Sequence, residues 1–413
     1  MQPTPWPHAG IVDFIEGQCT HLATSRRAIF CNGRSYHEPA IEHVFKMLLT
    51  TWIVILMNRH EASRPIDEPA VLAMSALECF TNGCCGHNIS PVVLENPIIQ
   101  PRLQAHHIAT FSEICATIPM PAKAALENYF ARSQYKRPDD TEARIVTQVG
   151  ILVDIMLCAE QRSTLPCAAQ SLTVQLEAIS KAAAIPAIAS LARHIQQELR
   201  SRRKSKKCAT SLIDVVQGIV PGMQLIVRWA NAPMTHQETT LVHTVKQTLI
   251  ALLAMLLDPR PHTAFTWSDA LGLTIIHDTA EPMIGDVVYG IKQDPAIHAE
   301  LHRLEVEAFS HYIQALPLTA RRYCVELFQQ QGTATPLAEW FDWSEKIGYL
   351  LTPLFELRFT QHPELAAMVE KNIIKLDRLY PRLQATGLGH IYSAIRPEAL
   401  RHCSSIGQTD LFL

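Results

Sequence analysis

The sequence has little charge and no excess of either sign. Lys and Arg total 36 against 39 Asp and Glu, so the formal net charge is −3, and charged residues make up 18% of the 413 positions. Without a global positive field a chain has no means of holding nucleic acid or an anionic membrane by electrostatics alone. We therefore expect no stable nucleic-acid complex. Hydrophobic residues at 48% argue against a disordered chain.

Long hydrophobic runs are also missing. The two most apolar stretches, Met47–Met57 and Leu249–Leu257, are shorter than a bilayer requires, so we expect buried helices and no membrane partner. The N-terminal residues Met1–Pro7 have neither the basic start nor the apolar stretch of a secretory signal. The 11 cysteines, an odd number spread over the chain, fit reduced thiols in a cytoplasmic protein.

No alternation of polar and β-branched residues is long enough to predict a sheet. Apolar residues recur instead every three or four positions, as in Thr244–Leu257, Pro295–Ala315 and Ala366–Leu379, which predicts helices and an all-α fold class. A chain of 413 residues is long for a single core, so we expect at least two. We expect the helices of the second half to be separated at prolines 259, 261, 317, 336, 353 and 363.

The chain resembles itself at a shift of about 200 residues. Glu38 and His43 correspond to Glu238 and His243, and each pair is followed by an apolar helix, a turn and another helix. We therefore predict a tandem duplication of one helical domain, with a first domain over residues 1–199, a basic linker over 200–210 and a second domain over 211–413. A solvated linker and a local phosphate-binding patch are both compatible with the run Arg-Ser-Arg-Arg-Lys-Ser-Lys-Lys that begins at Arg200.

The second half carries the residues that suggest chemistry. His277 and Asp278 are adjacent near the end of an apolar helix, His243 precedes them, and carboxylates follow at positions 281, 286, 342 and 345. Imidazole and carboxylate groups together suit a borderline divalent cation. A single His-Asp pair is common by chance, so the spacing of the further residues decides whether it marks a metal site.

In that spacing the second half resembles the HD-domain phosphohydrolases, specifically the bacterial HD-type 5′-deoxynucleotidases. Arg228-Trp229 precede His243 at the interval typical of that family, and the element His277-Asp278-Thr279-Ala280-Glu281 followed by Asp286 is complete. The resemblance covers roughly residues 212–379. It implies an HD-type helical bundle that hydrolyses (deoxy)nucleoside 5′-monophosphates with the help of a metal ion.

The resemblance also implies the metal ligands. They are His243, His277, Asp278 and an acidic residue on a later helix, where the family has aspartate and this chain has Glu345. Asp342, about one helical turn earlier, is the alternative last ligand. One divalent ion per chain is implied, and Co, Mn, Mg, Fe and Zn remain open. Such an ion would acidify water and polarise a phosphoryl oxygen.

The remaining implied roles concern the proton and the nucleotide substrate. Asp278 and Glu281 are the implied catalytic residues, with Glu281 as a proton shuttle or orienting group that makes no metal contact. Arg228 has the planar, bidentate geometry that suits phosphate. Asp286 falls where the family contacts the sugar 3′-hydroxyl, and Trp229 where an aromatic residue disfavours a 2′-hydroxyl.

The first half lacks most of this pattern. His43 is retained, but Glu78-Cys79 stands in place of the His-Asp pair and Thr147-Gln148-Val149 in place of Glu345, so we predict a pseudo-catalytic copy. Because single-domain HD nucleotidases commonly act as homodimers, the resemblance implies an intrachain pseudodimer of the two halves, with further homo-oligomers left open. In the first half we expect Cys79, Cys84 and Cys85 to be buried or surface thiols, and a thiolate zinc site that they form with His87, at a non-standard spacing, is the alternative.

Two alternatives to monophosphate hydrolysis remain. The same site is compatible with a nucleoside triphosphate or a cyclic nucleotide as substrate. Triphosphate sites normally recruit several basic residues, and near the motif we find mainly Arg228, with Arg260 and Lys292 as further candidates. The other alternative is a nucleotide-binding scaffold in which glutamate at position 345 marks binding without turnover.

Overall fold

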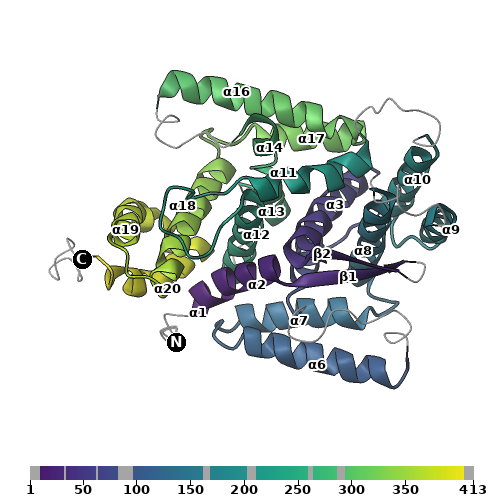
Figure 1. The fold of residues 1–413 in the computed structure, drawn as a ribbon, viewed down its shortest axis with the longest axis horizontal. Coiled ribbons are helices and arrows are strands. Elements are labelled where there is room, and N and C mark those ends of the chain that lie inside the picture. The colour runs from purple at the N-terminus through teal and green to yellow at the C-terminus, as the bar shows by residue number, and fades with distance from the viewer. Residues whose placement is uncertain are drawn as a thin grey trace.

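The structure is a computed structural model that describes residues 10–31, 34–61, 64–81, 96–160, 168–201, 211–258, 264–285 and 294–403. Several predicted features lie outside the described residues: most of the basic linker, and Cys84, Cys85, His87, Pro259, Arg260, Pro261, Asp286 and Lys292. Helices form nearly all of the described chain (Figure 1), which confirms the predicted all-α class.

The first half consists of α1 (Gly10–Val12), η1 (Asp13–Gly17), α2 (Gln18–Thr24), β1 (Arg26–Cys31), β2 (Arg34–Pro39), α3 (Ala40–Glu61), α4 (Glu68–Leu77), α6 (Ile99–Ile114), α7 (Ala122–Tyr135), α8 (Thr141–Glu160), α9 (Ala168–Lys181) and α10 (Pro186–Ser201). The second half consists of η3 (Asp214–Gly218), α11 (Ile219–Leu225), α12 (Thr240–Leu257), α13 (Trp267–Ile276), α14 (Glu281–Ile284), α16 (Pro295–Tyr312), η4 (Ile313–Ala315), α17 (Leu318–Phe328), α18 (Pro336–Glu356), α19 (Pro363–Leu383) and α20 (Gly387–Leu400).

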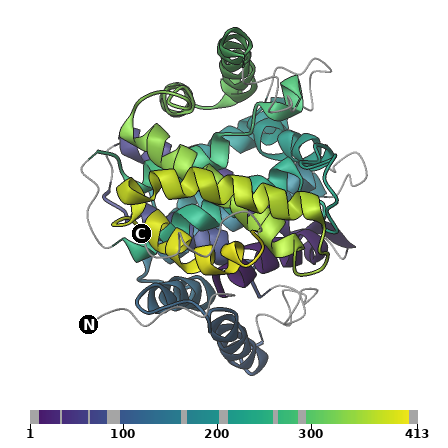
Figure 2. The same cartoon turned by 90° about the vertical axis from the view of Figure 1, so that its left-hand side faces the viewer.

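The order of elements in the first half recurs in the second. Each half opens with a π-helical turn and a short helix, and later reaches a long apolar helix followed by a helix of 10 residues. The helices that follow come in corresponding pairs on opposite sides of the molecule. The pair α6 and α7 lies opposite α16 and α17 in both views (Figure 1 and Figure 2).

A two-stranded ribbon departs from the prediction that no sheet forms. β1 and β2 pair antiparallel, with Arg27 opposite Glu38. Each strand has 6 residues, too few for an alternating pattern to stand out in the sequence. The second half has a shorter extended pairing at the same point, where the Arg228 backbone N–H donates to the Glu238 carbonyl at 2.8 Å. Both pairings place an arginine beside the glutamate that precedes the long helix.

The helix starts follow ordinary capping rules. The side chains of Thr239, Thr266 and Thr335 each accept a hydrogen bond from a backbone N–H in the first turn of α12, α13 and α18. Pro336 and Pro363 occupy the first turn of α18 and α19, where a missing N–H leaves no hydrogen bond unmade. These prolines mark helix starts, as predicted.

Pro353 does not end a helix, contrary to the prediction. It lies inside α18, which continues to Glu356. A proline there removes the N–H that would have bonded the carbonyl of Tyr349, four residues earlier. The side-chain amide of Asn372 on α19 donates to that carbonyl instead, at 3.0 Å. A neighbouring helix thus satisfies the acceptor that the proline leaves open.

The long helices α3 and α12 form the centre of the molecule (Figure 1). By length and composition alone both are apolar enough to cross a membrane, so the prediction that these stretches are too short was wrong. In the fold, 94% and 89% of their most apolar windows are buried inside the protein. They lie side by side and act as core helices, as the sequence predicted.

The two halves are packed closely against each other. η1 of the first half contacts α12 and α18, and η3 of the second half contacts α3 and α8. Trp52 on α3 packs so tightly on Gly272 of α13 that a Cβ there would lie 2.4 Å from the indole ring. At the end of α3, Arg59 donates to Asp269 at 3.0 Å and to Ser268 at 2.8 Å. The buried cores of the halves are continuous.

Candidate functional site

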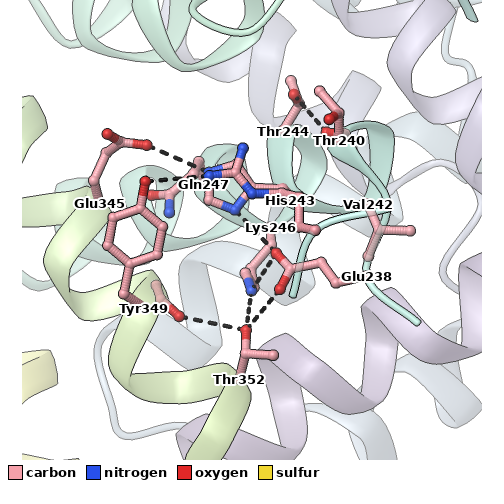
Figure 3. Close-up of polar contacts among 12 residues, drawn as sticks. Glu238, Thr240, Val242, His243, Thr244, Lys246, Gln247, Glu345, Tyr349 and Thr352 are labelled. Carbon is pink, nitrogen blue, oxygen red and sulfur yellow. Dashed lines mark hydrogen bonds and ion pairs between the residues drawn. The ribbon is translucent and has the colours of Figure 1, made fainter. Parts of the chain in front are cut away.

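Helices α12, α13 and α18 bring four of the predicted metal ligands together. His243 lies in the first turn of α12, His277 caps the C-terminus of α13 with Asp278 next to it, and Glu345 projects from α18. The Nε2 atom of His243 lies 3.3 Å from Glu345 Oε1 and 3.8 Å from Asp278 Oδ2. His277 Nε2 lies 3.1 Å from Asp278 Oδ2 and 3.8 Å from Glu345 Oε1. Figure 3 shows Glu345 facing His243.

The orientation of the two imidazoles fits a divalent cation. His277 Nδ1 lies 2.8 Å from the Thr274 carbonyl, which only accepts, so Nδ1 donates. His243 Nδ1 likewise donates to Glu238 Oε1 at 2.9 Å. Both Nε2 atoms therefore point to the interior of the cluster, where His277 Nε2 is buried beside the Asp278 carboxylate. One ligand atom each from His243, His277 and Glu345 lie within 4.8 Å of one another.

The charges around the cluster are strongly coupled. Burial by itself lowers the pKa of His277, but the carboxylates of Asp278 and Glu345 outweigh burial and raise this pKa to about 9. Burial likewise disfavours ionised Asp278, yet the positive charges of His277 and Arg228 hold the pKa of Asp278 well below its usual range. The donor set is therefore anionic on its carboxylate side, as a cation site requires.

Arg228 lies at the edge of this cluster. Its guanidinium donates to Asp278 Oδ2 at 2.8 Å and to the Tyr349 hydroxyl at 3.2 Å, and it lies 3.7 Å from Glu281 Oε1. The ring of Tyr349 in turn stacks on His243, with ring centroids 5.9 Å apart. The predicted phosphate-binding arginine thus stands directly beside the predicted metal ligands.

Trp229 adopts a backbone conformation that is uncommon for a bulky residue. Its φ of 59° lies in the left-handed region, which typically costs about 1–3 kcal/mol and is concentrated at functional sites. In this conformation the indole Nε1 donates to Glu238 Oε2 at 2.8 Å, and the ring meets Tyr349 edge-on. Glu238 therefore fixes Trp229 and His243 together.

Glu281 is buried close to the ligands but is held by other partners. The Thr240 hydroxyl donates to its Oε2 at 2.7 Å, and its backbone N–H bonds the Asp278 carbonyl. No described contact joins its carboxylate to the two ligand histidines. This position agrees with a group that acts beside a metal ion without binding it.

The structure brings Glu345 to the histidines and leaves the alternative ligand Asp342 elsewhere. The Asp342 side chain is 58% exposed and pairs with Lys346 on the outer face of α18. Asp286, the predicted contact to the sugar 3′-hydroxyl, lies outside the described residues.

Sequence reasoning missed the groups that support the ligands. Arg228 is contacted by Tyr349, and Glu238 is contacted by Lys246 and Thr352. None of the three contacting residues belongs to the motif that carries the family resemblance. Glu238 was noted only as part of the repeat. The available signal was its fixed spacing to the histidine, because the pair Glu38 and His43 has the same separation and the same contact, at 3.0 Å.

The first half holds a reduced version of the cluster. Arg27, Glu38, His43 and Lys46 are present, and His43 Nε2 lies 3.9 Å from Glu78 Oε2. Glu78 follows the 10-residue helix α4 as its C-cap, as His277 follows the 10-residue helix α13, so Glu78 occupies the place of His277 and Cys79 that of Asp278.

The last ligand also has no acidic counterpart in the first half. Gly150 of α8 packs on Met47, and Gly348 of α18 packs in the same way on Gln247. These two glycines therefore align the sequence of α8 with that of α18. Three residues before each glycine stand Thr147 and Glu345 respectively. A group formed by Glu38, His43 and Asp154 has cation-binding residue types. However, Arg27 already donates two hydrogen bonds to Asp154, at 2.6 and 3.0 Å.

Comparison with known proteins agrees with this geometry. Residues 217–381 match a protein family described as 5′-deoxynucleotidase YfbR-like. No curated protein and no solved structure matches the chain significantly. The matched segment contains the two histidines, Asp278 and Glu345 together with Arg228 and Glu281. Residues 217–381 therefore carry the sequence pattern of the 5′-deoxynucleotidase YfbR-like family of the HD superfamily.

Proposed function

We propose that the second half hydrolyses (deoxy)nucleoside 5′-monophosphates to nucleoside and phosphate. The family implies an HD-type hydrolase. The observation that carries the finer proposal is the convergence of His243, His277, Asp278 and Glu345 beside one arginine. A divalent cation bound by these four residues supplies electrophilic stabilisation of the phosphoryl oxygens and acidifies water.

The protein groups around the ligands then have defined tasks. Arg228 donates two parallel N–H groups to the phosphate, and Asp278 and Tyr349 hold it in position for this. Glu281 accepts the proton of the attacking water, and the Thr240 hydroxyl keeps its carboxylate oriented. Trp229 lies against the sugar and favours a deoxyribose, while Glu238 holds the indole.

The charges favour a monophosphate over a triphosphate. Among the described residues, Arg228 is the one basic side chain, arginine or lysine, that contacts a carboxylate of the proposed ligands. Lys246 is fully occupied by Glu238, Glu16 and Thr352 in the buried layer behind His243. Additional phosphates would need further cations to offset their charge.

We propose in addition that the two halves arose by tandem duplication and form an intrachain pseudodimer with one catalytic site, acting in the cytoplasm. The recurrence of elements and the reciprocal packing of η1 and η3 support this. The first half has Glu78, Cys79 and Thr147 in place of His277, Asp278 and Glu345, which supports a pseudo-catalytic first half.

Phosphate release tests the proposed activity. The purified chain is assayed with Co²⁺ or Mn²⁺ against a panel of deoxy- and ribonucleoside 5′-monophosphates, triphosphates and cyclic nucleotides. We expect turnover of monophosphates, with deoxyribonucleotides preferred. Preference for triphosphates or cyclic nucleotides would instead support the alternative substrates, and inertness toward all of them would support a nucleotide-binding scaffold.

A further inference from the structure

A carboxylate from the first half reaches the site of the second half. Glu16 lies on η1, which packs against α12 and α18. The residue is only 6% exposed, and its Oε1 atom lies 3.3 Å from Lys246 Nζ and 3.1 Å from Thr352 Oγ1. A carboxylate this deeply buried is tolerated only when its charge is paired and its oxygens are hydrogen-bonded.

Through Lys246 this carboxylate is connected to a metal-ligand histidine. Lys246 Nζ lies 2.6 Å from Glu238 Oε1, and Thr352 Oγ1 lies 2.9 Å from Glu238 Oε2. Glu238 also accepts from His243 Nδ1 and Trp229 Nε1. A carboxylate has about four acceptor positions, so these contacts use them all. Figure 3 shows Glu238 between His243, Lys246 and Thr352.

In the first half, the positive charge of Lys46, the counterpart of Lys246, is balanced by carboxylates from the same chain segment. Lys46 lies 2.8 Å from Glu38 and 3.4 Å from Glu42, one helical turn earlier, so two local carboxylates balance the ammonium. In the second half the position of Glu42 is taken by Val242. The second carboxylate is supplied there by Glu16, from the other half of the molecule.

Among the described residues, η3 of the second half brings no carboxylate to the cluster of the first half. The position of Glu16 in the second half is Gln217 on η3, whose amide donates to the backbone carbonyl of Val153 at 3.4 Å. Gln217 therefore packs into the first half as Glu16 packs into the second, but it brings no charge. The charged contact is specific to the half that has the complete ligand set.

We propose that Glu16 is a positioning residue for the metal site, through which the first half supports the second. It shares the charge of Lys246, so that Glu238 remains available to hold His243 and Trp229. Without Glu16 the whole ammonium charge acts on Glu238 and draws this carboxylate away from the imidazole N–H. Such partners orient a ligand histidine and raise its basicity, so their loss weakens metal binding. The relevance for turnover rests on the proposed function, but the effect on metal binding does not.

The test is the affinity of Glu16→Gln for Mn²⁺, followed by the electron paramagnetic resonance signal of the free ion. We expect about tenfold weaker binding by a protein that is as folded as the wild type by circular dichroism. Gln217→Ala is the matched control, because it removes the corresponding contact on the other side, and we expect its Mn²⁺ affinity to be unchanged.

A charge transplant separates this role from simple packing. In Glu16→Gln/Val242→Glu the second carboxylate is placed one turn before Lys246, as Glu42 is before Lys46, and we expect most of the affinity to return. The indole N–H resonance of Trp229, assigned with Trp229→Phe, reports Glu238 without any metal and should shift in Glu16→Gln and return in the double variant.

The outcomes decide between the proposals. A folded Glu16→Gln protein with a Mn²⁺ affinity within twofold of the wild type, or a wild type that binds no Mn²⁺, overturns the role of Glu16. A wild type that binds Mn²⁺ and depends on Glu16 but releases phosphate from no nucleotide overturns the proposed function alone.

Discussion

Asp278 is the residue at which the charges of the site meet. Its Oδ2 accepts from Arg228 at 2.8 Å and lies 3.1 Å from His277 Nε2. Glu281 is close in space, 3.7 Å from the same guanidinium, yet its other oxygen is bound by Thr240. We therefore propose different tasks for the two carboxylates, with Asp278 as a metal ligand and Glu281 as a proton acceptor.

Replacing each carboxylate should separate these tasks. Asp278→Ala should abolish both Mn²⁺ binding and phosphate release, since it removes a ligand. Glu281→Ala should keep Mn²⁺ binding and lose about 10²- to 10⁴-fold in turnover, the usual contribution of a general acid–base group. Calorimetric Mn²⁺ titration and phosphate release measure the two properties.

Cys79→Ala provides the matched control, because Cys79 stands in the place of Asp278 in the first half. We expect it to change neither property. If Glu281→Ala lost the metal as well, Glu281 would be a ligand and its assignment as proton acceptor would be wrong.

Which residues the sequence could predict depended on where their partners lie. His243, His277 and Asp278 belong to a motif with characteristic spacing, so they were found, and the position of Glu345 followed from the same pattern. Lys246 and Glu16 acquire their role only through contacts across 230 positions of chain, as Glu16–Lys246 shows. No local pattern contains that information, because burial and pairing are set by packing.

At the scale of elements, the close approach of α18 to α12 places Glu345 against His243. Gly348 permits it, since a Cβ at this position would lie 2.1 Å from Gln247 Nε2. The Gln247 amide is buried, and its oxygen accepts from Ser344 at 3.1 Å, which restricts where it can move. The distance between these two helices is therefore a determinant of the ligand geometry.

Gly348→Ala should push the two helices apart. We expect a loss of about 1–3 kcal/mol in the free energy of unfolding, typical of overpacking in a core, together with weaker Mn²⁺ binding. Urea unfolding and a Mn²⁺ titration measure the two effects. Gly218→Ala is the control, because its Cβ would meet nothing closer than 4.0 Å. An unchanged Mn²⁺ affinity in Gly348→Ala would show that the helix spacing does not limit the site.

The positions of the helices were largely predictable from the sequence. The departures from helical rules, a proline inside α18 and a short β-ribbon, were not. Apolar periodicity predicted the central helices because these helices are buried on one face or on nearly all faces. The continuation of α18 through Pro353 depends on Asn372 of another helix, which no helix-local rule includes. The β1–β2 ribbon is too short to show a period.

At the scale of the whole molecule, Arg59 connects the halves. It donates to Glu68 in its own half and to Asp269 and Ser268 in the other, and it stacks near Trp52 at 5.4 Å. These groups are partly buried, so their pairing is screened less than that of surface ions. The contact therefore contributes to holding the halves in one arrangement.

Arg59→Ala should destabilise the folded chain. We expect the free energy of unfolding to fall by about 2 kcal/mol, because two carboxylates lose their partner. This value lies between those for exposed and for fully buried ion pairs. Arg303→Ala is the control: Arg303 makes ion pairs of the same chemistry with Glu300 and Glu307 on the exposed face of α16, and its removal should leave the unfolding midpoint unchanged. Equal midpoints for both variants would mean that the contact between the halves adds no stability.

Separating the halves tests the pseudodimer directly. Residues 1–201 and 211–413, co-expressed as two chains, should copurify as a one-to-one complex, because η1 and η3 each pack into the opposite half and the cores are continuous. The second half alone should self-associate to cover the same apolar face. In such a homodimer Gln217 would replace Glu16 beside Lys246, so we expect its Mn²⁺ affinity to resemble that of Glu16→Gln and to be restored by adding residues 1–201. Size-exclusion chromatography with light scattering and Mn²⁺ titration measure both properties. A monomeric second half with the affinity of the intact chain would mean that the first half is needed neither for assembly nor for the site.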